Sequence, residues 1–196
     1  MRLKTLLLTA LLMLSVLPLD CYAQEAWNLS FSPALNFPIS KVQDEPLRIG
    51  NGFEFGVDYQ WSERIQPYVG VIWNRFDTDE DFDEPNIRYV QKGVAVGLRY
   101  HFALANGKAK ICFLRGGMVL MDLRTRSEGG EFDINTSFNI GAQFGAGLSL
   151  PLAHQWALRP ELRWTLINHQ ADAPFSSADL DFRHLSLAVG LRYSWQ

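Results

Sequence analysis

The strict alternation of the last twelve residues, 185–196, constrains the fold more than any other feature of the chain. Leucine, valine, tyrosine and tryptophan occupy every odd position from Leu185 to Trp195, and small or polar residues occupy the even positions. A side-chain period of two is that of a β-strand, and the segment is longer than most strands of soluble sheets. It has the length of a tilted strand that crosses a bilayer. The segment therefore predicts a membrane-spanning strand with one apolar and one polar face.

The beginning of the chain has the features of a secretory signal peptide. Two basic residues precede the apolar run 6–17, and small residues precede a cleavage site ahead of Gln24. The run is short for a transmembrane helix. We therefore expect residues 1–23 to be a signal peptide that is removed, and residues 24–196 to form one outer-membrane β-barrel domain. Acylation of Cys21 is the alternative, but the three residues before it differ from those of a lipidation site.

Charge and hydropathy narrow the class of protein. A net charge of −3 disfavours nucleic acid as a partner. A mean hydropathy near zero would usually indicate a soluble protein. A barrel wall has the same average, because every second residue faces inward. After removal of residues 1–23, Cys112 is the only cysteine left, so no intramolecular disulfide can form.

Seven further segments show the same alternation. The predicted strands are 27–35, 53–61, 67–76, a segment ending at 94–102, 109–123, 138–150, 156–166 and 185–196. The fifth is the least regular, and the assignment that turns Arg115 inward places Cys112, Leu114, Gly116, Met118 and Leu120 outward. The orientation of Tyr68 and Ile72 in the third strand stays open. The strands therefore predict an all-β protein, an eight-stranded antiparallel up-and-down transmembrane barrel.

The connections between these strands alternate in length. The short ones are 62–66, 103–108 and the pair 153–154; the long ones are 36–52, 77–88, 124–136 and 168–181. Short periplasmic turns and longer outer loops are typical of outer-membrane barrels, so both termini are expected in the periplasm. Six aromatic residues fall at the same predicted periplasmic edge, as in an aromatic girdle: Trp61, Tyr100, Phe102, Trp156, Tyr193 and Trp195. A soluble barrel such as a lipocalin predicts the reverse distribution, with the apolar residues inside.

Several of these segments resemble the small eight-stranded OmpA/OmpX-like outer-membrane barrels. The resemblance rests on the alternating strands, on 66–71 (Gln-Pro-Tyr-Val-Gly-Val), on the glycine-rich 141–147 and on the closing 189–193. It covers the chain after the signal peptide, and its motifs are shared by many porin-like families. It implies an outer-membrane barrel from a group that includes adhesins, resistance proteins and structural proteins. That family usually ends on an aromatic residue, whereas here Gln196 follows the last tryptophan.

The candidate site consists of the charged residues at the inward-facing positions of the predicted strands. They are Glu54, Asp58, Arg99, Arg115, Arg159, Glu161, Arg163 and Arg192. Asp58, Arg99, Arg159 and Arg192 are expected near the periplasmic rim, and Glu54, Arg115 and Arg163 higher. Buried charges have to pair, and an eight-stranded barrel holds side chains and little else. We therefore predict a polar network that fills the interior. A conduction path, as in a narrow porin, is the alternative.

The segment 77–84 is the candidate for metal binding, with six acids in eight residues. Oxygen-rich loops can hold calcium and could bridge to anionic lipopolysaccharide. The segment lacks the glycine and the distal glutamate of an EF-hand, so we predict a solvated loop and no metal site.

The pair His184 and Ser186 is the candidate for catalysis. Its His-x-Ser spacing resembles the arrangement in lipid A deacylases. By parity both side chains point inward, away from lipid, and no acid follows on the strand to orient the histidine. We therefore predict a non-enzymatic barrel without catalytic residues or cofactor, with a structural role or a role in binding through its outer loops. The expected partners are outer-membrane lipid, lipopolysaccharide and an extracellular ligand, and the barrel is expected to be a monomer.

Overall fold

The computed structural model describes residues 27–40, 47–78, 87–103, 111–127, 133–173 and 176–195. The signal peptide predicted at residues 1–23 lies outside them. The strands in the described residues are β1 (Trp27–Pro38), β2 (Gly50–Tyr59), β3 (Ile65–Asp77), β4 (Ile87–Ala103), β5 (Ile111–Ser127), β6 (Asp133–Asn135), β7 (Asn139–Ala153), β8 (Trp156–Ala173) and β9 (Ser176–Ser194). This part of the chain contains no helix that is both long enough and apolar enough to cross a membrane.

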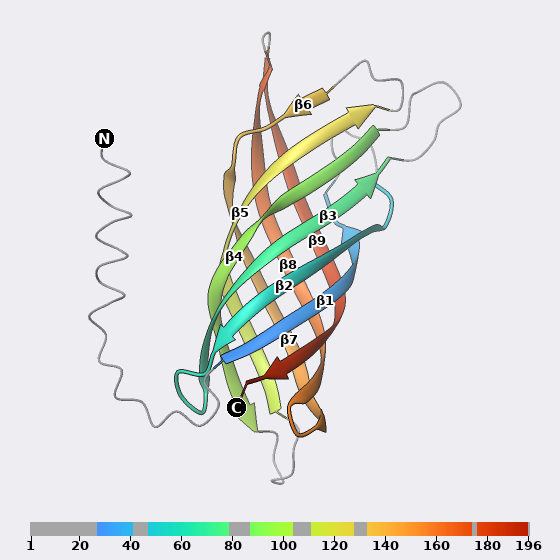
Figure 1. The fold of residues 1–196 in the computed structure, drawn as a ribbon. Coiled ribbons are helices and arrows are strands. Elements are labelled where there is room, and N and C mark those ends of the chain that lie inside the picture. The colour runs from blue at the N-terminus through green and yellow to red at the C-terminus, as the bar shows by residue number, and fades with distance from the viewer. Residues whose placement is uncertain are drawn as a thin grey trace, which may run out of the picture.

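Eight of these strands form one closed antiparallel ring (Figure 1). Neighbours in the chain pair with each other, except that β5 pairs with β7, and β1 closes the ring by pairing with β9. This closing pair of strands, the seam, also has a side-chain hydrogen bond, which Ser194 Oγ donates to Asn28 Oδ1 over 2.7 Å. The short β6 pairs only with the far end of β5. The predicted eight-stranded up-and-down barrel is confirmed.

The alternation of the sequence matches the two faces of the wall. On β9, Leu187, Val189 and Leu191 are 44–50% exposed, whereas Ala188 and Gly190 between them are buried. The same holds on β5, where Leu114, Met118 and Leu120 are exposed and Arg115 is buried, as predicted. Cys112 shares their outward parity but is buried. The molecule is therefore apolar outside and filled with side chains inside.

The two kinds of connection lie at opposite ends of the barrel. The turn between β2 and β3 is short, and Ser62 Oγ accepts a hydrogen bond from the backbone N–H of Ile65 over 3.0 Å. The turn between β7 and β8 is shorter still, and both turns lie at the end that carries the C-terminus and the start of β1 (Figure 1). The predicted aromatic edge lies at this same end, with Trp61, Trp156 and Trp195 all about half exposed.

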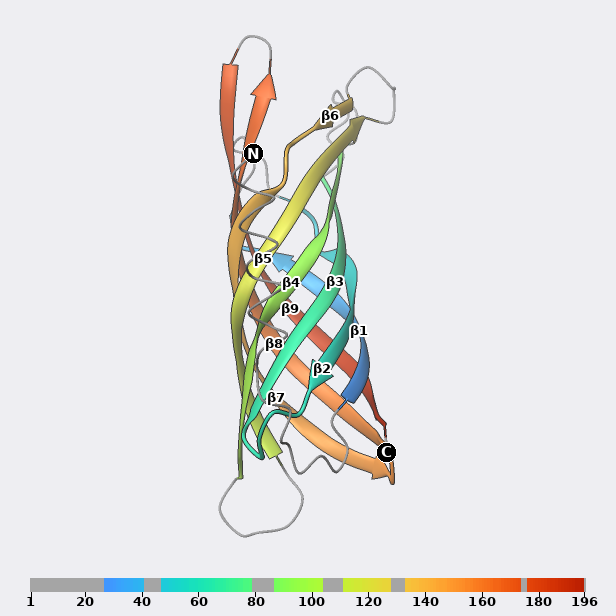
Figure 2. The same cartoon turned by 60° about the vertical axis from the view of Figure 1, so that its left-hand side comes forward.

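The predicted long loop 168–181 is wrong. β8 and β9 continue to pair through this segment, from Asn168 with Asp181 up to Ala173 with Ser176. The two strands rise beyond the rest of the ring as a hairpin (Figures 1 and 2). Most residues of this segment are small or polar, which is the composition of a connecting loop. The sequence alone therefore could not distinguish the hairpin from a loop.

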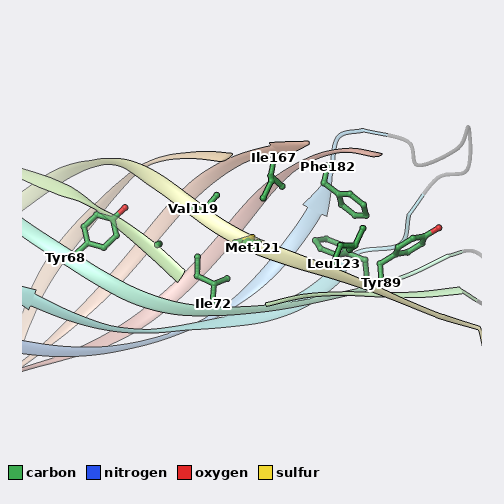
Figure 3. Packing of buried hydrophobic residues seen from close by; sticks show 10 residues of the cluster. Tyr68, Ile72, Tyr89, Val119, Met121, Leu123, Ile167 and Phe182 are labelled. Atoms are coloured by element: carbon green, nitrogen blue, oxygen red, sulfur yellow. The ribbon is translucent and has the colours of Figure 1, made fainter. Parts of the chain in front are cut away.

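The interior also contains an apolar cluster that the sequence analysis did not predict. Its buried members are Tyr68, Ile72, Phe76, Tyr89, Ala95, Val119, Met121, Leu123, Ile167 and Phe182 (Figure 3). The ring of Phe182 lies 6.0 Å from that of Phe76 and 5.7 Å from that of Tyr89. Tyr68 and Ile72, whose orientation the alternation left open, both face inward. The interior thus holds a cluster of apolar side chains towards the end that carries the β8–β9 hairpin, where Gln91 and His169 are also buried.

Candidate functional site

Seven of the eight predicted interior charges are buried almost completely. Glu54, Asp58, Arg99, Arg115, Arg159, Glu161 and Arg163 are each at most 4% exposed. The eighth, Arg192, is half-buried on β9, where it pairs across the strands with Ser30 and Ala157. All eight therefore lie at inward-facing positions of their strands. Their contacts form two levels inside the barrel.

The level nearer the start of β1 and the end of β9 is built on Asp58 of β2. Its carboxylate accepts hydrogen bonds from Arg99 of β4 and, over 2.9 Å, from Arg159 of β8. Gln66 Oε1 accepts a second bond from Arg159 over 3.0 Å and lies 2.9 Å from His101 Nε2. Strands on opposite sides of the ring are thereby joined through one carboxylate.

The level above is built on Glu54, which precedes Asp58 by four residues on β2. It accepts hydrogen bonds from Arg115 of β5 over 3.1 and 3.2 Å and from Arg163 of β8 over 2.6 Å. Arg99 lies 3.8 Å from the same carboxylate and so connects the two levels. Arg115 also donates to Glu161 over 3.2 Å and to Gln143 over 2.7 Å. The charges form one continuous network.

Tyr68 connects this network to the apolar cluster. The guanidinium carbons of Arg99 and Arg115 lie 4.5 and 4.2 Å from the centre of its ring, which is the geometry of cation–π contacts. The ring fits because Gly97 and Gly117, which are paired on β4 and β5, have no side chain to occupy the space. Sequence reasoning missed this role, although Tyr68 shares the inward parity of Gly70 and Asn74 on β3.

Neutral side chains also take part in this network, in which arginines outnumber acids by five to three. Gln66 and Gln143 each accept a hydrogen bond from an arginine, and Tyr68 accepts one from Arg115 Nε over 3.3 Å. Hydrogen bonds from a buried guanidinium to neutral oxygens limit the cost of removing it from water. These neutral oxygens meet part of the hydrogen-bonding need of the arginines, while the Nε atoms of Arg99, Arg159 and Arg163 have no partner among the described residues.

The predicted catalytic candidates lie inside the barrel wall. His184 is 1% exposed and Ser186 is 4% exposed, so neither reaches the outer surface. The histidine ring lies 5.3 Å from the ring of Phe76. Within the described residues its Nδ1 atom has no hydrogen-bond partner, so no carboxylate orients it there. A serine nucleophile needs a base that is held by a third group.

The acidic segment 77–84 is described only at Asp77 and Thr78. Asp77 forms ion pairs with Arg75 over 3.0 Å and with Arg88 over 3.1 Å, and the acids from Asp79 onward lie outside the described residues. The described residues contain no cluster of three or more histidine, cysteine or acidic side chains that could hold a metal ion.

Comparison with known proteins identifies the kind of molecule. The family model for the outer membrane protein beta-barrel domain matches residues 6–193. Among solved structures, the chain is similar to Neisserial surface protein A, with a TM-score of 0.63, 14% identity, and coverage of 86% of this chain and 97% of the other.

Two further solved structures share this architecture. OprG from Pseudomonas aeruginosa has a TM-score of 0.58 and 10% identity, covering 90% of this chain and all (100%) of its own. Ail, the attachment invasion locus protein of Yersinia pestis, has a TM-score of 0.53 and 13% identity, covering 87% and 100%. At these identities the likeness shows the fold alone. Among curated proteins, none matches the chain.

Removing one carboxylate from the network should destabilise the barrel. Asp58→Ala leaves Arg99 and Arg159 buried beside each other, and Glu161→Ala removes a carboxylate from Arg115. Breaking a buried pair on one side typically costs roughly 3–5 kcal/mol. Urea unfolding in detergent micelles measures this loss, and we expect Asp58→Ala to show the larger one.

The control for both variants is Asp181→Ala. Asp181 pairs with Arg183, but the two side chains are 44% and 54% exposed. Exposed pairs contribute little, so this change should cost less than about 1 kcal/mol. An unfolding midpoint that is the same in all three variants would show that the buried network does not stabilise the barrel.

A methyl group at Gly97 should disturb the centre of the network. A β-carbon there would lie 2.7 Å from the Tyr68 hydroxyl and would collide with the backbone of Gly116. We expect Gly97→Ala to lower the free energy of unfolding by about 1–3 kcal/mol, the usual cost of overpacking. Gly116→Ala is the matched control, because its β-carbon would meet nothing closer than Phe144 at 3.7 Å. Equal stability of the two variants in the same urea titration would contradict the steric argument.

Proposed function

The chain belongs to the outer membrane protein β-barrel domain family, and from this premise we propose that it is a closed, non-enzymatic barrel that acts through its outer surface. The role is either structural or the binding of an extracellular ligand by the connections at its outer end. The observation that carries this proposal is the two-level charged network. It fills the interior with side chains instead of leaving a passage.

Burial of the charges supports a closed interior over a narrow porin. Seven ionised side chains at most 4% exposed are out of contact with bulk water. In a conducting pore such groups would line an aqueous path and remain solvated. The apolar cluster above them, with Phe76, Met121 and Leu123 fully buried, adds a second obstruction. Eight strands leave little space beyond these side chains.

The distribution of turns and aromatic residues supports an orientation with both termini in the periplasm. The short turns and Trp61 belong to the end where β1 starts and β9 ends. So does the contact between Trp156 and Tyr193, whose ring centres lie 4.9 Å apart. Aromatic rings favour the membrane–water boundary. The β8–β9 hairpin and β6 belong to the opposite end, which we assign to the cell surface.

Analogy supports a role at the surface. Two of the similar structures are named a surface protein and an attachment invasion locus protein. Binding residues of rigid scaffolds are concentrated in their connecting segments. Here those segments include 41–46, 79–86 and 128–132, which lie outside the described residues.

The positions of His184 and Ser186 support a non-enzymatic barrel over a lipid A deacylase. A lipid-cleaving serine would have to meet its substrate at the outer surface of the wall. Here both side chains are buried inside it.

Planar-bilayer recording tests the closed interior. The purified barrel should show no steady conductance under conditions in which a reconstituted porin conducts, because its charges are paired across the lumen. A steady, porin-like current from the wild-type protein would overturn the proposal.

Epitope insertion tests the orientation. An epitope inserted at Asp81, between β3 and β4, should bind antibody on intact cells, because that connection belongs to the end assigned to the surface. One inserted at Asn106, between β4 and β5, should bind only after permeabilisation. Both positions lie outside the described residues, so neither insertion alters a described strand. Labelling of Asn106 alone on intact cells would reverse the assignment.

A further inference from the structure

Basic side chains gather on the outer wall of the barrel where β3, β4 and β5 approach the end assigned to the surface. The register aligns three outward-facing rows there: Trp73, Lys92 and Asp122; Arg75, Val90 and Arg124; Asp77, Arg88 and Arg126. Adjacent strands lie about 5 Å apart, so the side chains of a row are direct neighbours. We call these nine residues the basic lattice.

The basic lattice carries more positive charge than its own acids neutralise. It holds five cations against two carboxylates. Asp77 is shared by Arg75 and Arg88, and Asp122 lies 3.8 Å from Arg124, an arginine that remains 55% exposed. Lys92 and Arg126 are exposed and take part in no ion pair among the described residues. Lattice residues, Trp73 and Lys92 among them, line a surface hollow of about 310 Å³.

The height of the lattice on the wall indicates what it meets. The outward row directly below it is Val71, Val94 and Leu120, which are 38–56% exposed. The row below that is Val69, Val96 and Met118, which are 48–61% exposed. Such apolar rows belong in the hydrocarbon of the membrane. The next row up begins with Trp73, a residue type that favours the boundary, so the cations lie at the level of the lipid head groups.

We propose that the basic lattice is a binding site for the phosphate groups of an anionic lipid of the outer leaflet. Guanidinium and ammonium groups are the usual partners of phosphate, and arginines in adjacent rows can share the oxygens of one phosphate. The apolar rows below would contact the acyl chains of the same molecule. This assignment rests on the proposed orientation, because that orientation decides which leaflet the site faces.

Lipid fits this site better than the chain's own acidic segment does. The lattice cations project from the outer wall, beside the membrane, while β3 ends at Asp77, at the rim. The one described acid of that segment already pairs with Arg75 and Arg88. The competing occupant is nevertheless testable, because residues 79–81 can be neutralised without altering a described residue.

Lipid titration of the purified barrel in neutral maltoside micelles tests the proposal. Diphosphoryl lipid A is the probe, and native mass spectrometry counts the bound molecules. We expect the triple variant Arg75→Gln, Lys92→Gln, Arg126→Gln to bind this lipid about tenfold or more weakly, since each lost cation weakens attraction to an anionic lipid. The monophosphoryl form should bind wild type less tightly, and added salt should weaken all binding.

The matched control is Arg183→Gln. Arg183 is outward-facing and exposed, and it lies one row above Trp164 and Leu185, as Arg75 lies one row above Trp73. It stands apart from the lattice and has Asp181 as its own partner. This variant should bind diphosphoryl lipid A as wild type does. Equal weakening by Arg183→Gln and by the triple variant would mean a diffuse charge effect and would overturn the site.

Three other results would also overturn the proposal. One is wild-type affinity in the triple variant. Another is displacement of the lipid by millimolar inorganic phosphate, which would make the lattice a general phosphate site. The third is binding only after Asp79→Asn, Glu80→Gln and Asp81→Asn, which would show that the chain's own acids occupy the lattice. Bilayer recording measures whether the barrel interior is closed, and epitope labelling measures the orientation of the barrel in the membrane. Neither depends on lipid binding, so a failure of lipid binding leaves the proposed function standing.

Discussion

Pairing of charge across the lumen is the interaction on which the rest of the structure depends. The wall has apolar side chains outside, so the inward positions must hold what remains of each strand, including five arginines. A guanidinium out of water is tolerated only with anionic or hydrogen-bonding partners. Asp58 and Glu54 supply them from one strand, β2, and reach arginines on β4, β5 and β8. The network thus sets which strands can face each other.

The interior has two chemical zones with different consequences. In the polar zone, each contact is directional, so the strands are held in a particular register by hydrogen-bond geometry. In the apolar zone around Phe76 and Phe182, packing is less directional and stabilises the barrel through burial. Tyr68 belongs to both zones, since its ring contacts two guanidinium groups and also joins the apolar cluster.

Period-two alternation explains what could and could not be predicted from the sequence. It places a residue on one face, so the inward position of Arg115 and the outward position of Leu114 followed directly. It does not give the height of a residue along the barrel axis relative to residues on other strands, because that height depends on how the paired strands are staggered around the ring. The partners of Glu54 and the apolar cluster around Phe182 were therefore out of reach. The hairpin beyond Asn168 was missed because small and polar residues, typical of a connecting loop, make up most of it.

The seam between β1 and β9 has a consequence for the order of assembly. Asn28 and Ser194 lie 166 positions apart in the chain, yet they are bonded neighbours in the wall. Every other pairing of the ring can form from strands that follow closely in sequence, but this one needs the last strand to be present. Until then both end strands have unpaired backbone groups, which hydrocarbon does not tolerate. Insertion into the membrane as a closed barrel is thus tied to the presence of β9, and a chain that lacks this strand would not be able to close.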